Sequence, residues 1–370
     1  AEENALKYHG VGKFDKITGK APASKATLPS YTNVFGKTML ELAEKNQNVI
    51  AITAAMPTGT GLVEFGEKYP DRFFDVGIAE AHAACFSAAL AAEGVRPYLT
   101  VYSTFMQRAY DQVIHDMAIQ NLPVVICMDR AGLVGNDGPT HHGVFDIAYL
   151  STVPNVTLCA PKDGNELRAM LHYTVDHEFD GIIALRYPRD TVPVAMSEEV
   201  ARIQWGTWEQ LGPASDIALL AVGSMVYPAL QAAQSLTAEG IHVTVVNARF
   251  VKPLDEEMLA RIRQTTRAVI TIEEGSKRGG FGETVGARLL ADGYTGHFRA
   301  LGTPDRFVTH GNRSQLLAEV GLTPEGIAAA VKEIAVIEEP HTRGLLQRLR
   351  LRRNGLGRKH EPVTNHSPTG

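Results

Sequence analysis

The sequence lacks a long hydrophobic run: no apolar stretch approaches the roughly 18 residues that a membrane-spanning helix needs. Its first residues, Ala1-Glu-Glu-Asn, are polar and unlike a secretory signal peptide. We therefore expect no membrane segment and no membrane partner. We also expect a cytoplasmic location.

Cysteine is scarce. The three cysteines, Cys85, Cys127 and Cys159, all lie in apolar surroundings and have no spacing typical of a metal or redox site. An odd number also argues against a disulfide framework. We expect three buried thiols in a reducing compartment.

The sequence has no general excess of positive charge. Its formal net charge is −5, and residues 336–370 contribute seven Lys or Arg against only three Asp or Glu, so the preceding part is more acidic still. An acidic globular part gives no reason to expect nucleic-acid binding. We expect residues 336–370 to form a basic, disordered tail; a helix that docks on an anionic surface is the alternative.

What the sequence does contain is a regular alternation of strand and helix patterns. With 370 residues, 44% of them hydrophobic, the chain can bury two sizeable cores. Runs such as Val124 to Met128 are typical of parallel strands covered on both faces. We predict an α/β protein with two doubly wound, mostly parallel-sheet domains at residues 31–195 and 210–335, preceded by a linker at 1–30.

In the first domain we expect strands at 50–53, 73–76, 97–101, 124–128, 156–159 and 181–185, of which 73–76 is short and buried. The expected helices are 32–45, 63–69, 78–92, 105–120 and 164–177, and Asp163 is a good N-cap for the last. In the second domain we expect strands at 217–222, 242–247 and 268–273. The helices there are predicted at 226–239, 255–265 and 279–291.

Glu80 is the first candidate for chemistry. It follows the 73–76 strand and a turn at Gly77, so it lies in the first turn of the next helix. A first-turn Glu often only complements the helix dipole at the surface. Apolar neighbours on both sides favour the other interpretation, a carboxyl that points into the protein, where it could hold or share a proton.

Three motifs, which follow one another along the chain, together resemble the sequence of a known enzyme family. Asp75-Val-Gly-Ile-Ala-Glu80 is followed by Tyr102-Ser-Thr-Phe-Met-Gln-Arg-Ala-Tyr-Asp111 and by Asp129-Arg-Ala-Gly-Leu-Val-Gly-Asn-Asp-Gly-Pro-Thr-His141. Together they resemble the 1-deoxy-D-xylulose-5-phosphate synthases, a family of transketolase-like thiamine diphosphate enzymes. The resemblance extends from about Tyr8 to about Ala335.

The resemblance implies a thiamine diphosphate-dependent transferase that joins pyruvate to D-glyceraldehyde 3-phosphate with loss of carbon dioxide. This reaction is the first step of the non-mevalonate isoprenoid pathway and also serves thiamine synthesis; the family is homodimeric and uses Mg²⁺. Glu80 matches the carboxyl that bonds to N1′ of the cofactor's aminopyrimidine. Phe105 matches the stacking aromatic, and Ile78 matches a third cofactor contact.

The resemblance also implies substrate residues. Tyr102, Arg108 and Arg189 match the ligands of the acceptor phosphate, a role that suits planar guanidinium groups. Asp137 and His141 match catalytic polar residues beside the reacting carbons. The adjacent histidines could instead suggest a metal site, but no nearby Cys or Glu has suitable spacing, so we expect no metal ligand on this chain.

One family feature is missing. The family binds Mg²⁺ and the diphosphate through a Gly-Asp-Gly motif and a later Asn in an N-terminal domain, and this sequence contains no Gly-Asp-Gly. We therefore expect the chain to be inactive without such a domain. The alternatives are a split transketolase subunit, the β subunit of a 2-oxo acid dehydrogenase, or a non-catalytic assembly subunit.

Overall fold

The computed structural model describes residues 14–20 and 27–336. The basic tail from 337 onward and much of the 1–30 linker therefore lie outside the described residues. The chain divides into two compact units, residues 1–134 with 153–205, and residues 135–152 with 206–370. The segment 135–152, which the sequence assigns to the first domain, thus groups with the second unit. No helix among the described residues is long and apolar enough to cross a bilayer.

The first unit is built on a parallel sheet. Its strands are β1 (Val49–Thr53), β2 (Phe73–Asp75), β3 (Arg96–Tyr102), β4 (Val124–Asp129), β5 (Val156–Cys159) and β6 (Ile182–Arg186). Their order is β5-β6-β4-β3-β1-β2, and every pairing among them is parallel. All residues of β4 and β6 are buried, as expected for apolar runs covered on both faces.

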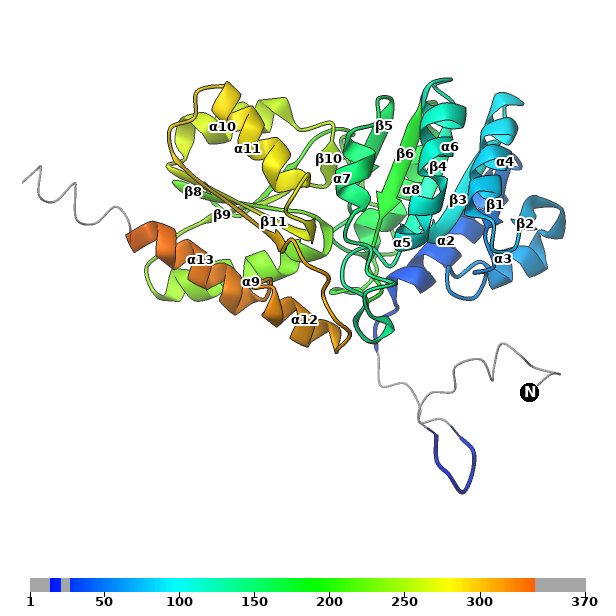
Figure 1. Cartoon of the computed structure of the whole chain (residues 1–370), viewed down its shortest axis with the longest axis horizontal. Helices are drawn as coiled ribbons and strands as arrows, with labels where there is room; N and C mark the ends of the chain where they lie inside the picture. Colours follow the sequence, from blue (N-terminus) through cyan, green and yellow to red (C-terminus); the bar gives the residue numbers. More distant parts are fainter. Residues whose placement is uncertain (1–13, 21–26, 337–370) are drawn as a thin grey trace, which may run out of the picture. The chain divides into compact units, whose positions relative to one another are not determined.

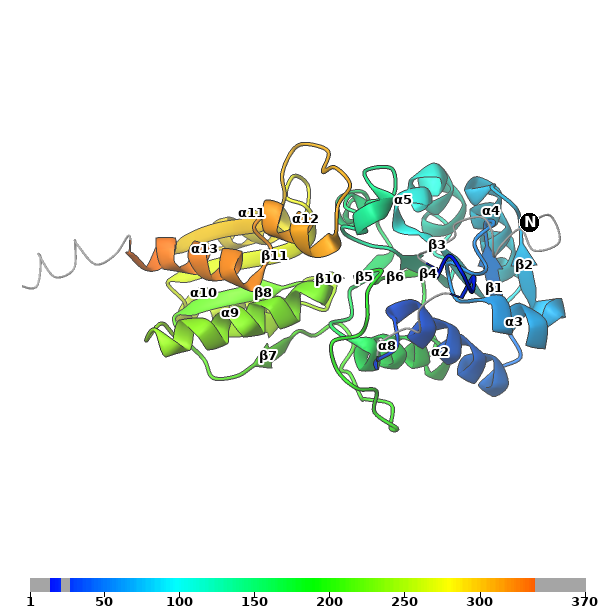
Figure 2. The same ribbon diagram turned by 90° about the horizontal axis from the view of Figure 1, so that it is seen from below.

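Helices cover both faces of this sheet. Figure 2 shows α2 (Tyr31–Lys45) and α8 (Gly164–Asp176) on one face and α4 (Glu80–Ala92) on the other, while α3 (Val63–Lys68) precedes β2. Glu41 of α2 accepts hydrogen bonds from Arg168 and His172 of α8, each at 2.9 Å. Asp163 caps α8 by accepting from the Glu166 N–H, which confirms its predicted role.

Two sequence predictions about this unit are wrong in detail. β2 is not buried, because it is the last strand of the sheet, pairs only with β1 and leaves its three residues half-buried or exposed. The single helix predicted at 105–120 is broken, because the backbone leaves helical geometry at Ala109 (φ −114°). Its pieces are α5 (Ser103–Met106), η3 (Gln107–Ala109), α6 (Tyr110–Gln112) and the π-helical η4 (Val113–Ala118).

The second unit repeats the α/β plan. Its sheet has the order β12-β11-β8-β9-β7, and only the β7–β9 pair is antiparallel. Figure 1 shows α10 and α11 on one face and α9 and α13 on the other. The strands of this sheet are β7 (Glu209–Leu211), β8 (Ile217–Ala221), β9 (Thr244–Asn247), β11 (Ala268–Ser276) and β12 (His297–Thr303), and the short strand β10 (Phe250–Lys252) is not part of it. The helices are α7 (Asp146–Ser151), α9 (Val226–Ala238), α10 (Glu256–Thr265), α11 (Phe281–Ala291), α12 (Arg313–Glu319) and α13 (Pro324–Val336).

The predicted fold class is therefore confirmed in both units, with β8, β9, β11, α9, α10 and α11 close to their expected positions. The sequence analysis missed β7, β10, β12, α7, α12 and α13. β7 and β10 have three residues each, and β12 has mostly half-buried residues, so neither length nor an apolar run marks them.

The prediction of three buried thiols holds for Cys127 and Cys159 but is wrong for Cys85, which is exposed. Cys85 lies in α4, and its Sγ donates to Oδ2 of Asp116 in η4 at 2.8 Å. Because this hydrogen bond favours the protonated thiol, it is the main cause that raises the pKa of Cys85 to about 11. Exposure alone therefore does not make this thiol reactive.

We predict that Asp116→Asn speeds alkylation of Cys85 at pH 8. Removing the carboxylate lowers the pKa of the thiol towards its ordinary value, so the thiolate fraction should rise by up to roughly 100-fold. Iodoacetamide labelling followed by peptide mass spectrometry measures the rate, with Cys127 and Cys159 as slow internal controls. Equal rates in the variant and the parent would show that Asp116 does not protect the thiol.

Candidate active site

The predicted site residues of the first unit gather where its strands end. Tyr102 is the last residue of β3, and Glu80 begins the helix after β2. Phe105 and Arg108 follow in the broken helical stretch behind β3, and Arg189 follows β6. Carboxyl ends of neighbouring parallel strands are where open α/β sheets bind ligands.

The Glu80 side chain is buried, as its apolar neighbours predict, and retains only 4% of its exposure. It is the first residue of α4, where the unpaired N–H groups and the dipole of the helix favour a negative charge. Its Oε1 accepts a hydrogen bond from Nη1 of Arg108 at 2.5 Å. The carboxyl is thus removed from water and faces one cation.

Phe105 provides an aromatic surface beside this ion pair. Its ring stacks on Tyr102 with centroids 5.5 Å apart and an interplanar angle of 18°. The Cζ of Arg108 lies 4.7 Å from the Phe105 centroid, within the range of a cation–π contact. Arg108 therefore touches both the buried carboxyl and the aromatic ring, although 54% of its side chain stays exposed.

A second arginine, which the sequence analysis did not select, supports this cluster. The Cζ of Arg130 lies 3.7 Å from the centroid of the Tyr102 ring, and its Nη1 donates to the Gly59 carbonyl at 2.7 Å. Its Nη1 also lies 3.2 Å from Oδ1 of Asp129, which is fully buried. The only signals in the sequence are its position directly after a long apolar strand and its place in the motif from Asp129 to His141.

Asp129 is itself unusual. Its Oδ2 accepts from the Thr32 hydroxyl at 2.6 Å, at the start of α2. Burial raises the pKa of this carboxyl to about 6, although Arg130 and Thr32 both favour its charged form. The end of β4 is thus tied to α2 and to the loop after β1.

The other predicted residues lie in the turn before α4, after β6 and in the segment 135–152. Ile78 is 81% exposed in the turn before α4, and Arg189 is exposed beyond β6. Asp137 and His141 belong to the segment that groups with the second unit, where Nδ1 of His141 lies 2.9 Å from the Thr140 hydroxyl. Their site roles stay predictions.

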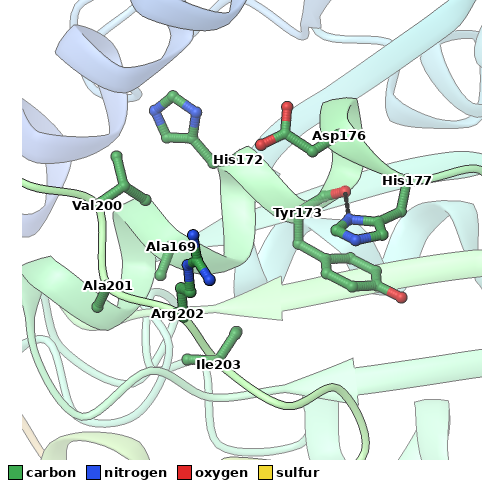
Figure 3. Close-up of a pocket in the computed structure, with 9 residues that line it drawn as sticks. All are labelled: Ala169, His172, Tyr173, Asp176, His177, Val200, Ala201, Arg202 and Ile203. Carbon is green, nitrogen blue, oxygen red and sulfur yellow. Dashed lines mark hydrogen bonds between the residues drawn. The ribbon is translucent and has the colours of Figure 1, made fainter.

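No group of three or more His, Cys, Asp or Glu side chains within residues 14–20 and 27–336 could hold a metal ion. A hollow of about 450 Å³ does exist elsewhere in the first unit (Figure 3), between α8 and the segment 200–203. Two of its polar groups are already paired, His172 with Glu41 and Asp176 with Lys45. It therefore carries no catalytic constellation of its own.

Comparison with known proteins identifies both units. Residues 28–194 match the family described as transketolase, pyrimidine binding domain, and residues 206–327 match transketolase, C-terminal domain. The chain is 54% identical over 334 residues to 1-deoxy-D-xylulose-5-phosphate synthase 1 of Geobacter sulfurreducens, covering 90% of this chain and 52% of that protein. It is 52% identical to the synthase of Gloeobacter violaceus with the same coverage. The chain thus spans about half the length of these curated relatives.

Solved structures agree. A split-gene transketolase, described as an inactive β4 tetramer, matches with a TM-score of 0.74 and 30% identity, covering 84% of this chain and 99% of that one. Transketolase from Campylobacter jejuni shares the fold, with a TM-score of 0.69, 18% identity and coverage of 90% of this chain and 51% of that one. The buried Glu80 thus lies in a pyrimidine-binding domain, and the chain belongs to the transketolase family.

Proposed function

We propose that this chain is the pyrimidine-binding and C-terminal part of a 1-deoxy-D-xylulose-5-phosphate synthase. Such an enzyme condenses pyruvate with D-glyceraldehyde 3-phosphate and releases carbon dioxide. The observation that carries the proposal is the buried carboxyl of Glu80, linked through Arg108 to the Phe105 ring, in a chain 54% identical to a protein of that name.

The residues of the first unit fit the pyrimidine half of thiamine diphosphate. When bound, this cofactor supplies a nucleophilic carbon and an electron sink for decarboxylation. Glu80 would hold a proton at N1′ of the pyrimidine, a role that needs a carboxyl shielded from water, and its side chain is 4% exposed. Phe105 would orient the ring by stacking.

The phosphate-bearing substrate calls for cations and hydroxyl groups. Tyr102, Arg108 and Arg189 are proposed to bind the phosphate of glyceraldehyde 3-phosphate, because guanidinium groups bind phosphate through two parallel hydrogen bonds. Asp137 and His141 are proposed to handle protons at the reacting carbons.

Arg108 would then have two roles in sequence. In this structure it donates to Glu80 and lies over Phe105, which are the two contacts proposed for the pyrimidine. A planar guanidinium and a planar aminopyrimidine compete for the same carboxyl and ring surface. Entry of the pyrimidine would therefore release Arg108, which then becomes available for the substrate phosphate.

The sequence lacks the Gly-Asp-Gly motif through which the family binds the diphosphate half of the cofactor. We propose that Mg²⁺ and the diphosphate are bound by a further domain, on the same polypeptide or another, and that turnover requires it. A homodimer remains a prediction from the resemblance, and a cytoplasmic location remains a prediction from the sequence itself.

A split transketolase subunit is the second candidate. It is favoured by the match to the split-gene transketolase chain, which this chain covers almost completely. The higher identity to the synthases, 54% and 52% in the first two, favours our proposal. Carbon dioxide release from pyruvate separates the two, because ketol transfer between sugars releases none. An assembly with a diphosphate-binding domain that transfers ketol groups without releasing carbon dioxide would refute the synthase.

We predict that Glu80→Gln abolishes turnover in that assembly while the fold survives. The amide keeps the size of the side chain but cannot hold the proton, so kcat should fall by at least about 100-fold. Circular dichroism checks the fold, and Glu93→Gln, at the other end of α4, is the matched control. Activity within about tenfold of the parent would remove Glu80 from the mechanism.

We predict that Arg108→Ala has opposite effects on cofactor and substrate. Removing the competitor of the pyrimidine should tighten thiamine diphosphate binding several-fold, measured by titration calorimetry. Loss of a charged hydrogen-bond donor, about 1.5 to 3 kcal/mol, should raise the KM for glyceraldehyde 3-phosphate roughly 10- to 100-fold but leave that for pyruvate unchanged.

Arg189→Ala is the matched control, because it removes a proposed phosphate ligand that lies after another strand, β6. It should weaken the phosphate substrate and leave cofactor binding unchanged. If Arg108→Ala weakened the cofactor instead, Arg108 would be a support of the pyrimidine site and not its competitor.

A further inference from the structure

We infer that Arg130 is a positioning residue that holds Tyr102 against the loop after β1 and so fixes the place of its hydroxyl. The contacts of Arg130 are observed in the structure and do not depend on the proposed function. Its consequence for substrate binding rests on the proposed function, in which Tyr102 binds the acceptor phosphate.

The backbone at Arg130 is the first evidence. Its φ is +62°, in the left-handed region that residues with a side chain rarely adopt. Hydrogen bonds hold the chain on both sides, from Ala131 N to the Tyr187 carbonyl at 3.0 Å and from Tyr187 N to the Met128 carbonyl at 3.1 Å. A large side chain kept in a conformation that glycine adopts more easily indicates that the side chain itself is needed there.

The side chain supplies the second evidence, because its guanidinium binds two separate segments at once. It stacks on the Tyr102 ring, 3.7 Å from Cζ to the centroid, and donates to the Gly59 carbonyl at 2.7 Å. Only 12% of the side chain is exposed. Desolvation strengthens such a cation–π contact, and a planar, forked cation can make both contacts where an ammonium could not.

Gly59 shows how closely the ring and the loop approach. A Cβ built at this position would lie 1.8 Å from the Tyr102 hydroxyl oxygen. A side chain there would displace the tyrosine, so the loop backbone lies directly against its ring. Arg130 therefore joins the two members of a tight contact, and movement of either would disturb the other.

Asp129 and Thr32 orient the arginine in turn. The fully buried Asp129 carboxylate pairs with Arg130 Nη1 at 3.2 Å and is bonded to the Thr32 hydroxyl at 2.6 Å. Buried ion pairs restrict geometry more than they add stability. This chain of contacts gives the Tyr102 ring a defined place at the end of β3.

The first test uses the 370-residue chain alone. In a sample labelled with 3-fluorotyrosine, the ¹⁹F resonance that Tyr102→Phe removes belongs to Tyr102. Arg130→Lys keeps the charge but loses the planar fork, so it should shift or broaden that resonance and leave the other tyrosines unchanged. Two controls apply: Arg96→Lys, whose Cζ lies 4.4 Å from the Phe179 ring, and Asn121→Gly, at another positive φ of +54°. Neither should affect it.

A second variant changes the contact between Tyr102 and the loop after β1 at Gly59 instead of Arg130. Gly59→Ala pushes against the Tyr102 hydroxyl and keeps the Arg130 side chain, so it should move the same resonance. If Gly59→Ala moves the resonance and Arg130→Lys does not, the positioning role of Arg130 is overturned.

The second test uses the active assembly with the diphosphate-binding domain. Arg130→Lys should raise the KM for glyceraldehyde 3-phosphate about tenfold, with the KM for pyruvate unchanged and kcat reduced no more than about threefold. A general structural defect would instead lower kcat and affect both substrates, which would contradict the inference. A shifted Tyr102 resonance with an unchanged KM would support the positioning contact and refute the proposed phosphate role of Tyr102.

Discussion

A carboxylate taken out of water needs a compensating charge, and in this structure the Glu80–Arg108 pair supplies it. Glu80 is 4% exposed, and an isolated buried carboxylate would be very unfavourable. The helix N-terminus helps, and Arg108 donates directly at 2.5 Å. The helix after β2 provides one partner and the stretch after β3 provides the other. The pair therefore requires the ends of two strands of one parallel sheet to be correctly placed.

The same requirement explains the broken helix behind β3. The sequence predicts one continuous amphipathic helix at 105–120, and its apolar positions support that prediction. The structure instead turns at Ala109, directly after Arg108, and continues with a π-helical segment. Local propensity favours the helix, whereas the ion pair and the aromatic contacts fix where its first turn must lie. Such departures from regular helix are common at functional sites.

The parallel strands and long helices could be predicted because they depend on periods of residues close in sequence. The residue types of the site were also recognisable, since Glu80 lies between apolar residues and Phe105 and Arg108 belong to a long motif. The pairing of Glu80 with Arg108 could not be predicted, because the hydrogen bond joins residues 28 apart and only the fold brings them together. Arg130 was missed for the same reason, since its bond to Gly59 spans 71 residues and its unusual φ leaves no mark in the sequence.

The two arginines of the site differ in a way that matters for chemistry. Arg130 is 12% exposed, has a fixed backbone conformation and binds a carbonyl, a carboxylate and a ring, so exchanging its partners would leave several buried groups unsatisfied. Arg108 is 54% exposed, so water or a phosphate can replace Glu80 as its partner, provided that the buried Glu80 carboxyl gains a new partner in exchange. Under the proposed function, in which the site first accepts a ring and then a charged substrate, one cation stays and one moves. The burial of the two side chains indicates that Arg130 is the cation that stays and Arg108 is the cation that moves.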